Sequence, residues 1–196
     1  KGNVTVNGRN VHPGFAKNKM INSMNLAMEF DSMLPQFEVP EHTEGYEGFF
    51  HLERIAGKVE STSMQYIIRD FDRSGLEKRK EKMLKIAQYL NDKYGKDTVV
   101  LELEDQYFNM KEKIEPEIHV VENVKTAMSL AGVTPMVKPI RGGTDGARLS
   151  FRGLPTPNIF TGGHNFHGRY EYIPIDSMNR AVEVILKLIE VYTSTN

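Results

Sequence analysis

The first part of the chain begins with short-period alternation and then changes to helical spacing. Val4 and Val6 alternate with polar residues, which predicts a short strand over residues 3–6. The Asn7-Gly8 pair that follows is typical of a turn in which positive φ is tolerated. Apolar positions recur at helical spacing after this turn, so we expect a helix over residues 18–34.

The next segments extend this pattern into a complete small domain. Strands are expected over residues 48–55 and 63–71, with a connection through residues 56–62. A long amphipathic helix is predicted over residues 76–94 and a further strand over residues 99–103. The order β-α-β-β-α-β predicts an α+β domain in which two helices cover one face of a four-stranded antiparallel sheet. Its open edge strands favour pairing with a second chain.

The second part of the chain alternates between helical and strand-like segments. The pattern predicts helices over residues 118–131 and 147–151, strands over residues 136–139 and 157–160, and a final helix that begins after Asp176 as its N-cap. The final helix is expected to bury one stripe of apolar residues: Met178, Ala181, Val182, Ile185 and Ile189. Two short strands make a poor sheet, so this part is interpreted as one side of a larger α/β domain.

Composition excludes several classes of function. The formal net charge is −1, which argues against a nucleic-acid binder, because such proteins need excess Lys and Arg to contact phosphates. The short run Lys78, Arg79 and Lys80 lies beside glutamates in a helical pattern and indicates a solvated face. No apolar run approaches the roughly 18 residues of a membrane span.

The chain contains no cysteine, which excludes disulfides and thiolate zinc sites and suits a reducing cytoplasm. It opens directly in a strand pattern, with neither an initiator Met nor a signal-peptide core, so we expect it to be a piece of a longer protein.

The densest group of polar residues lies in a glycine-rich segment between a predicted strand and the final helix. It contains His164, His167, Arg169 and Glu171. Loops of this kind bind ligands in α/β enzymes, and a neutral imidazole is a good zinc ligand. The same residues are more often those of a flexible surface loop, because isolated histidine pairs are common and a zinc site needs three or four ligands. Local composition leaves both interpretations open.

Three further residues stand in patterns that allow chemistry but do not require it. Arg141 precedes Gly142-Gly143-Thr144-Asp145-Gly146, which suits either a helix cap at Thr144 or Asp145 or a site for a carboxylate. His12 lies in a His-Pro-Gly turn, and Arg69 ends a strand with alternating charge. The chain has no Ser-His-Asp order, cysteine nucleophile or His-Glu-x-x-His motif.

Several of these segments, in register along nearly the whole chain, resemble the peptidase T family. This family comprises tripeptide aminopeptidases of the dinuclear zinc aminopeptidase and deacylase group, in which a lid domain interrupts the catalytic domain. The matching stretches are Val11-His12-Pro13-Gly14-Phe15-Ala16-Lys17, Thr43-Glu44-Gly45-Tyr46-Glu47-Gly48-Phe49, Tyr66-Ile67-Ile68-Arg69-Asp70-Phe71-Asp72-Arg73, Pro139-Ile140-Arg141-Gly142-Gly143-Thr144-Asp145-Gly146, and Phe160-Thr161-Gly162-Gly163 through His167-Gly168.

The resemblance implies two domains and a dimer. Residues 1–110 would be the lid, which also forms a homodimer, and residues 111–196 would be the C-terminal part of the zinc-peptidase catalytic domain. Each full active site of such an enzyme holds two zinc ions, which generate a nucleophile from bound water. The implied substrate is a tripeptide, from which the N-terminal residue is removed.

The resemblance also implies roles for individual residues. His167, in the spacing His-x-x-x-Glu that ends at Glu171, matches the last zinc ligand. Arg69 and Arg141 match substrate contacts that grip the peptide carboxylate, a pairing that physical chemistry favours. His12 matches a lid histidine that reaches an active site across the dimer to stabilise charge on the reacting carbonyl.

Two other interpretations remain open. The chain could be a non-catalytic dimerisation module derived from such an enzyme. It could also come from a relative with other substrates, such as a zinc deacylase or dipeptidase. The Arg141 motif and the lid motifs favour the tripeptidase.

The remaining zinc ligands and the general base of the family have no counterpart in this sequence. One histidine cannot hold two zinc ions, because each needs about four ligands. We therefore expect the 196-residue chain alone to bind zinc weakly and to lack peptidase activity. A peptidase assay of the purified chain with and without a chelator tests this, and chelator-sensitive tripeptide hydrolysis would overturn it.

Overall fold

The computed structural model describes residues 1–194. The chain divides into two compact units, Lys1–Phe108 and Asn109–Asn196. No helix in residues 1–194 is long and apolar enough to cross a membrane.

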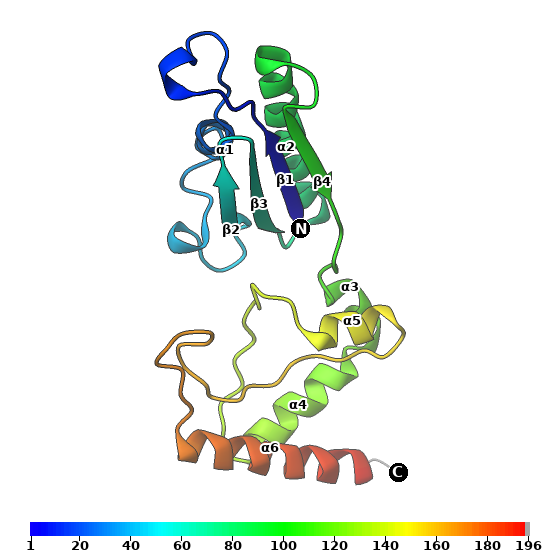
Figure 1. The fold of residues 1–196 in the computed structure, drawn as a ribbon. Helices are drawn as coiled ribbons and strands as arrows, with labels where there is room; N and C mark the ends of the chain where they lie inside the picture. Colours follow the sequence, from blue (N-terminus) through cyan, green and yellow to red (C-terminus); the bar gives the residue numbers. More distant parts are fainter. Residues whose placement is uncertain (195–196) are drawn as a thin grey trace. The chain divides into compact units, whose positions relative to one another are not determined.

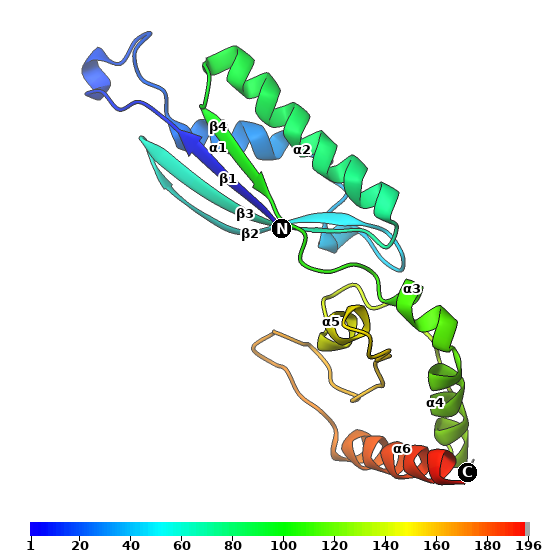
Figure 2. The same cartoon turned by 90° about the vertical axis from the view of Figure 1, so that its right-hand side faces the viewer.

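The first unit is built around one antiparallel sheet (Figure 1). Its elements are β1 (Gly2–Asn7), α1 (Ser23–Ser32), β2 (Phe49–Lys58), β3 (Ser61–Arg69), α2 (Arg73–Tyr94) and β4 (Val99–Leu103), with short 3₁₀ helices η1 (Pro13–Phe15) and η2 (Pro40–His42). The four strands pair antiparallel in the order β2-β3-β1-β4. Figure 2 shows α1 and α2 on the same face of the sheet. The predicted α+β fold, β-α-β-β-α-β, is confirmed.

The core lies between the sheet and these two helices. Alternate residues of β1 and β3 point into it, as the period of two predicts, and meet one stripe of each helix. The buried residues include Val4, Val6, Met64, Tyr66 and Ile68 from the strands and Leu26, Phe30, Met83, Ile86 and Leu90 from the helices. The Tyr66 hydroxyl donates a hydrogen bond of 2.8 Å to Asp31 Oδ1. Burial, with this bond to Asp31, raises the pKa of Tyr66 far above its ordinary value.

The first helix is shorter than the expected span of residues 18–34. Asn18 has a φ of +61°, which is incompatible with a helix. Ile21 instead forms a β-bridge with Arg9. Asn22 then caps the helix, since its side chain accepts a hydrogen bond of 3.0 Å from the backbone N–H of Met24. The helix therefore begins at Ser23.

The connection between β2 and β3 is also shorter than expected. β2 continues to Lys58 and β3 begins at Ser61, so only Val59 and Glu60 form the turn. Gly8 donates a backbone hydrogen bond of 2.7 Å to Glu60, and a Cβ at Gly8 would lie 2.2 Å from the carbonyl oxygen of Val59. Gly8 is absent from the residues with positive φ, so close backbone approach is the reason for glycine here.

The second long helix starts three residues earlier than expected, at Arg73, because Asp72 caps it with a hydrogen bond of 3.1 Å from Gly75 N–H. The interpretation of Lys78, Arg79 and Lys80 as a solvated face is wrong for Arg79 and Lys80, whose side chains are mostly buried in ion pairs. Arg79 pairs with Glu38 at 2.5 Å and with Asp70 at 3.3 Å. Lys80, also mostly buried, pairs with Glu77 and Asp105.

The second unit contains helices joined by segments without regular secondary structure. Its helices are α3 (Lys111–Ile114), η3 (Glu115–Glu117), α4 (His119–Leu130), α5 (Asp145–Phe151) and α6 (Ile175–Thr193). The strands expected over residues 136–139 and 157–160 do not form. An isolated strand leaves its backbone groups without ladder partners. The side chains of Met136 and Val137 are 70% and 73% exposed, so they have no covering layer within residues 109–194.

The last helix differs from expectation in its start and in its burial. It begins at Ile175, with Pro174 at the N-cap position, so Asp176 lies in its first turn and is not the cap. The apolar stripe expected to be buried is largely exposed, and Val184 is the buried residue of this helix. The stripe has the amphipathic spacing that was predicted, but the described chain does not cover it.

We predict that Leu90→Ala destabilises the first unit by about 2–5 kcal/mol, because it removes a fully buried side chain and leaves a cavity. Hydrogen exchange of β1 and β3 amides in the whole chain measures the loss as a lower free energy of opening.

The matched control is Leu84→Ala on the same helix, where the side chain is half exposed and the expected change is within about 0.5 kcal/mol. Equal effects of the two substitutions would contradict the assigned core.

Candidate functional site

His12 lies at the start of η1, in an exposed loop between β1 and α1. Its Nδ1 accepts a hydrogen bond of 3.1 Å from the backbone N–H of Gly14. Only an unprotonated nitrogen can accept, so the neutral ring carries its proton on Nε2. Its ring also lies 5.6 Å from the ring of Phe15. The turn therefore holds the imidazole and leaves an N–H donor on the outer side of the ring.

Arg69 is the last residue of β3 and lies against the segment that follows β4. Its Nη1 donates to the carbonyl oxygen of Ile68 at 3.2 Å. Both Nη1 and Nη2 lie 3.4 Å from Gln106 Oε1. The guanidinium carbon is 4.8 Å from the centroid of the Tyr107 ring. The side chain is partly buried and held on several sides.

His12 and Arg69 lie at opposite ends of the sheet of the first unit. Gly2 at the start of β1 pairs with Tyr66, close to Arg69, whereas Asn7 at its end leads to the loop of His12. The five residue steps from Gly2 to Asn7 span roughly 17 Å at about 3.4 Å each. Figure 1 shows η1 and the N-terminus at opposite ends of the sheet. One chain does not bring these two residues together.

His167 lies in a loop that is closed by hydrogen bonds. His164 and Tyr172 form a β-bridge, and their rings stack with centroids 4.9 Å apart. His167 has a φ of +66°, and its backbone N–H donates a hydrogen bond of 2.8 Å to Glu171 Oε2. Glu171 therefore orients the backbone of His167 and not its imidazole. The imidazole is exposed.

Arg141 lies before α5, in a segment that the next residues organise. Thr144 caps α5, since its Oγ1 accepts a hydrogen bond of 3.2 Å from Ala147 N–H, as one of the two expected caps. The amide of Asn158 donates to the same oxygen at 3.2 Å. Arg141 itself is partly buried. This arrangement fixes the loop that carries Arg141.

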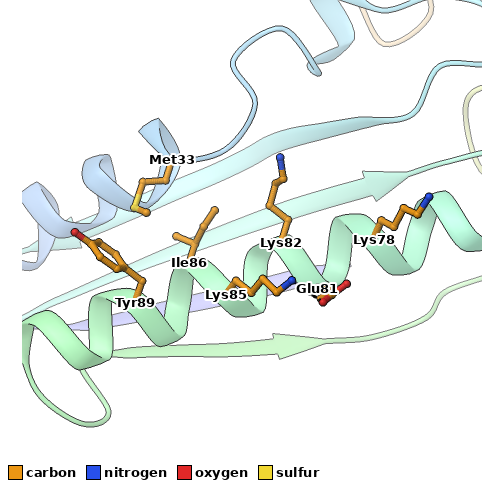
Figure 3. Close-up of a pocket in the computed structure, with 7 residues that line it drawn as sticks. All are labelled: Met33, Lys78, Glu81, Lys82, Lys85, Ile86 and Tyr89. Atoms are coloured by element: carbon orange, nitrogen blue, oxygen red, sulfur yellow. Dashed lines mark ion pairs between the residues drawn. The ribbon is translucent and has the colours of Figure 1, made fainter.

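The possible metal-donor side chains are not grouped in the described part of the chain. Within residues 1–194, no group of three or more His, Asp or Glu side chains is placed to hold a metal ion. His167 therefore belongs to no such group among the described residues. A groove of about 350 Å³ between α1 and α2 is a separate feature (Figure 3), and its lining contains no histidine. It has no part in the candidate site.

A family model described as peptidase dimerisation domain matches residues 1–98. The chain belongs to the peptidase dimerisation domain family. It is 63% identical over 191 residues to Peptidase T of Halothermothrix orenii, covering 97% of this chain and 47% of that protein. It is 62% identical over 190 residues to Peptidase T of Clostridium novyi, with the same coverage of 97% and 47%. The chain thus spans about half the length of these curated relatives.

Solved structures share the fold of this member of the peptidase dimerisation domain family. A tripeptidase from Staphylococcus aureus matches 97% of this chain and 50% of its own with a TM-score of 0.76 at 18% identity. The aminopeptidase PepT from Bacillus cereus has the same coverage, with a TM-score of 0.68 at 20% identity. An amidase of the hydantoinase/carbamoylase family from Burkholderia vietnamiensis reaches 0.73 at 14% identity, covering 97% and 46%. At these identities the likeness shows the fold alone.

Sequence reasoning did not find the partners of Arg69. Gln106 and Tyr107 lie near the join between the two predicted parts, where no regular pattern exists. The available signal was an aromatic pair, Tyr107 and Phe108, directly after a strand. Each ring lies under an arginine, Tyr107 under Arg69 and Phe108 under Arg73.

We predict that the neutral imidazole of His12 is held as the Nε2–H tautomer, because Nδ1 accepts from Gly14 N–H. Long-range ¹H–¹⁵N correlation spectra at about pH 8, where an ordinary histidine is neutral, report the tautomer.

The exposed His42 is the internal reference, since its ring has no hydrogen-bond partner within residues 1–194. A His12 spectrum with the same tautomer mixture as His42 would contradict the capped geometry.

Proposed function

We propose that this chain is part of a metal-dependent tripeptidase that removes the N-terminal residue from tripeptides. The observation that carries this proposal is the identity of 63% over 191 residues with Peptidase T. That similarity extends through both units, so it includes the lid motifs and the segment with His167.

The proposed domain division follows the two units. Residues 1–110 form the lid and dimerisation domain, which is supported by the match of the family model to residues 1–98. Residues 111–196 form the C-terminal part of the catalytic domain. Two features support this assignment: the exposed apolar stripe of α6, and residues 136–139, which have a strand-like sequence but form no strand. Both have the apolar periodicity of elements that pack against further layers in a larger α/β domain.

The proposed assembly is a homodimer through the lid. The family description supports dimerisation, and β2 and β4 both lie at edges of the sheet. Edge strands carry backbone groups that pair readily with another chain. We also propose a cytoplasmic location, which is consistent with the lack of cysteine in these 196 residues.

The dimer gives His12 a role that one chain cannot give it. Because His12 and Arg69 lie at opposite ends of one sheet, we assign His12 to the active site of the partner subunit. There its Nε2–H donates a hydrogen bond to the oxygen of the scissile carbonyl. The donor is fixed by the Gly14 contact before substrate arrives, so it stabilises developing negative charge without reorganisation.

Arg69 and Arg141 are proposed to bind the C-terminal carboxylate of the peptide. A guanidinium binds a carboxylate through two parallel N–H bonds, which gives both strength and orientation. Both side chains are partly buried, which strengthens such a pair relative to one in open water. This contact favours short peptides with a free C-terminus.

His167 is proposed to supply one zinc ligand. Its exposed imidazole and the fixed backbone of its loop fit a single contributed ligand, with the others provided by residues outside this chain. Two zinc ions, when bound, activate a water molecule as the nucleophile.

Two alternatives use the same fold. An amidase shares this fold, so the fold alone does not determine which reaction is catalysed. A deacylase or dipeptidase is therefore the second candidate. The two arginines favour the tripeptidase. The other alternative, a non-catalytic dimerisation module, would need neither Arg141 nor His167.

We predict that, in the full-length enzyme, His12→Ala and His167→Ala each abolish tripeptide hydrolysis, and that mixed dimers of the two variants regain it. One site of the mixed dimer then combines an intact His167 with the partner's intact His12. Hydrolysis of a tripeptide by co-expressed, differently tagged chains measures this.

Two controls distinguish the outcomes. Homodimers of the His12→Ala chain stay inactive if the role is correct. Activity lost in every combination would mean that His12 acts within its own subunit. Efficient cleavage of dipeptides or N-acyl amino acids, with no cleavage of tripeptides, would replace the tripeptidase by the second candidate.

A further inference from the structure

The contacts of Arg69 occupy some of its five N–H donors and leave others accessible. The Ile68 carbonyl takes one N–H of Nη1. Gln106 Oε1 lies in front of the edge formed by Nη1 and Nη2, 3.4 Å from each. Within residues 1–194, Nε has no hydrogen-bond partner. The Nε–H and the second N–H of Nη2 point in the same direction along one edge of the planar group.

This remaining edge has the geometry that a carboxylate needs. Two parallel N–H groups on one side of a guanidinium bind both oxygens of a carboxylate at once. The other edge is blocked by Gln106, and one flat face is covered by the Tyr107 ring at 4.8 Å. The two residues therefore determine which edge of Arg69 is presented.

Gln106 and Tyr107 are themselves fixed, because the segment that carries them is attached to the sheet and to α2. Lys1 and Glu104 exchange backbone hydrogen bonds of 2.8 and 2.9 Å. Lys80 pairs with Asp105 at 2.5 Å. On the other side, the Arg73 guanidinium lies 4.1 Å from the centroid of the Phe108 ring. The attachments flank Gln106 and Tyr107 in the sequence.

We propose that Gln106 and Tyr107 are positioning residues that direct the Nε/Nη2 edge of Arg69 toward the peptide carboxylate. This inference rests on the proposed role of Arg69 in the tripeptidase. Without the two residues the guanidinium keeps its charge but rotates among several orientations. The bidentate contact then forms at an entropic cost, which weakens binding of substrates with a free C-terminus.

The test uses the full-length enzyme, a tripeptide and the same tripeptide with a C-terminal amide. Tyr107→Leu is expected to raise KM for the free tripeptide about tenfold, which is within the range of a desolvated cation–π contact. We expect kcat to change by less than about twofold, because Tyr107 does not touch the reacting atoms. Tyr107→Phe keeps the ring and should behave as the unaltered enzyme.

The amide substrate separates positioning from general damage to the fold. It lacks the carboxylate, so its KM should be the same in the unaltered enzyme and in Tyr107→Leu. The matched control is Tyr89→Leu, which removes a half-exposed ring of α2 that contacts neither Arg69 nor the segment of Gln106 and Tyr107, and it should leave the KM of the free tripeptide unchanged. Equal losses of Tyr107→Leu on both substrates would overturn the inference in favour of a structural role.

Arg69→Ala distinguishes failure of this inference from failure of the proposed function. If Arg69→Ala leaves KM of the free tripeptide unchanged, the assigned role of Arg69 is wrong, and the inference falls with it. If Arg69→Ala raises KM but Tyr107→Leu does not, only the positioning role is overturned. Should Tyr107→Leu fail to fold, the exposed Gln106→Ala decides: a KM increase of about threefold for the free tripeptide alone supports the inference, and no increase overturns it.

Discussion

The central position of β1 is the constraint on which the first unit depends. This strand pairs with β3 on one side and β4 on the other, and both neighbours run antiparallel to it. Val4 and Val6 on its inner face are fully buried under the two helices. Because the strand joins the two ends of the sheet, it also determines that Arg69 lies near its start and His12 beyond its end.

Sequence periodicity predicted the first unit well because that unit contains its own partners. Alternation at Val4 and Val6 reports a buried strand face, and both neighbouring strands are within residues 1–108. The errors concern element ends, where single side-chain bonds decide. Asn22 and Asp72 cap their helices at positions that no hydrophobic pattern marks. The hairpin turn at Val59 and Glu60 depends on contacts from Gly8, which is distant in sequence.

The second unit and the site were less predictable for a different reason. A strand exists only when another strand pairs with it, so the β-favouring segment near Met136 and Val137 forms no strand and leaves both side chains exposed. The candidate residues could be named from their motifs, but not their surroundings. Nothing in the local pattern indicated that Glu171 bonds the backbone of His167, or that Gln106 and Tyr107 hold Arg69.

The reciprocal hydrogen bonds between Lys1 and Glu104 have a consequence for modularity. In such an antiparallel pair the two Cα atoms lie about 5.5 Å apart. Lys1, just before β1, and Glu104, just after β4, therefore lie side by side. A module with this property can be inserted into a surface loop of another protein without stretching the host backbone, and it can be exchanged between hosts as one piece.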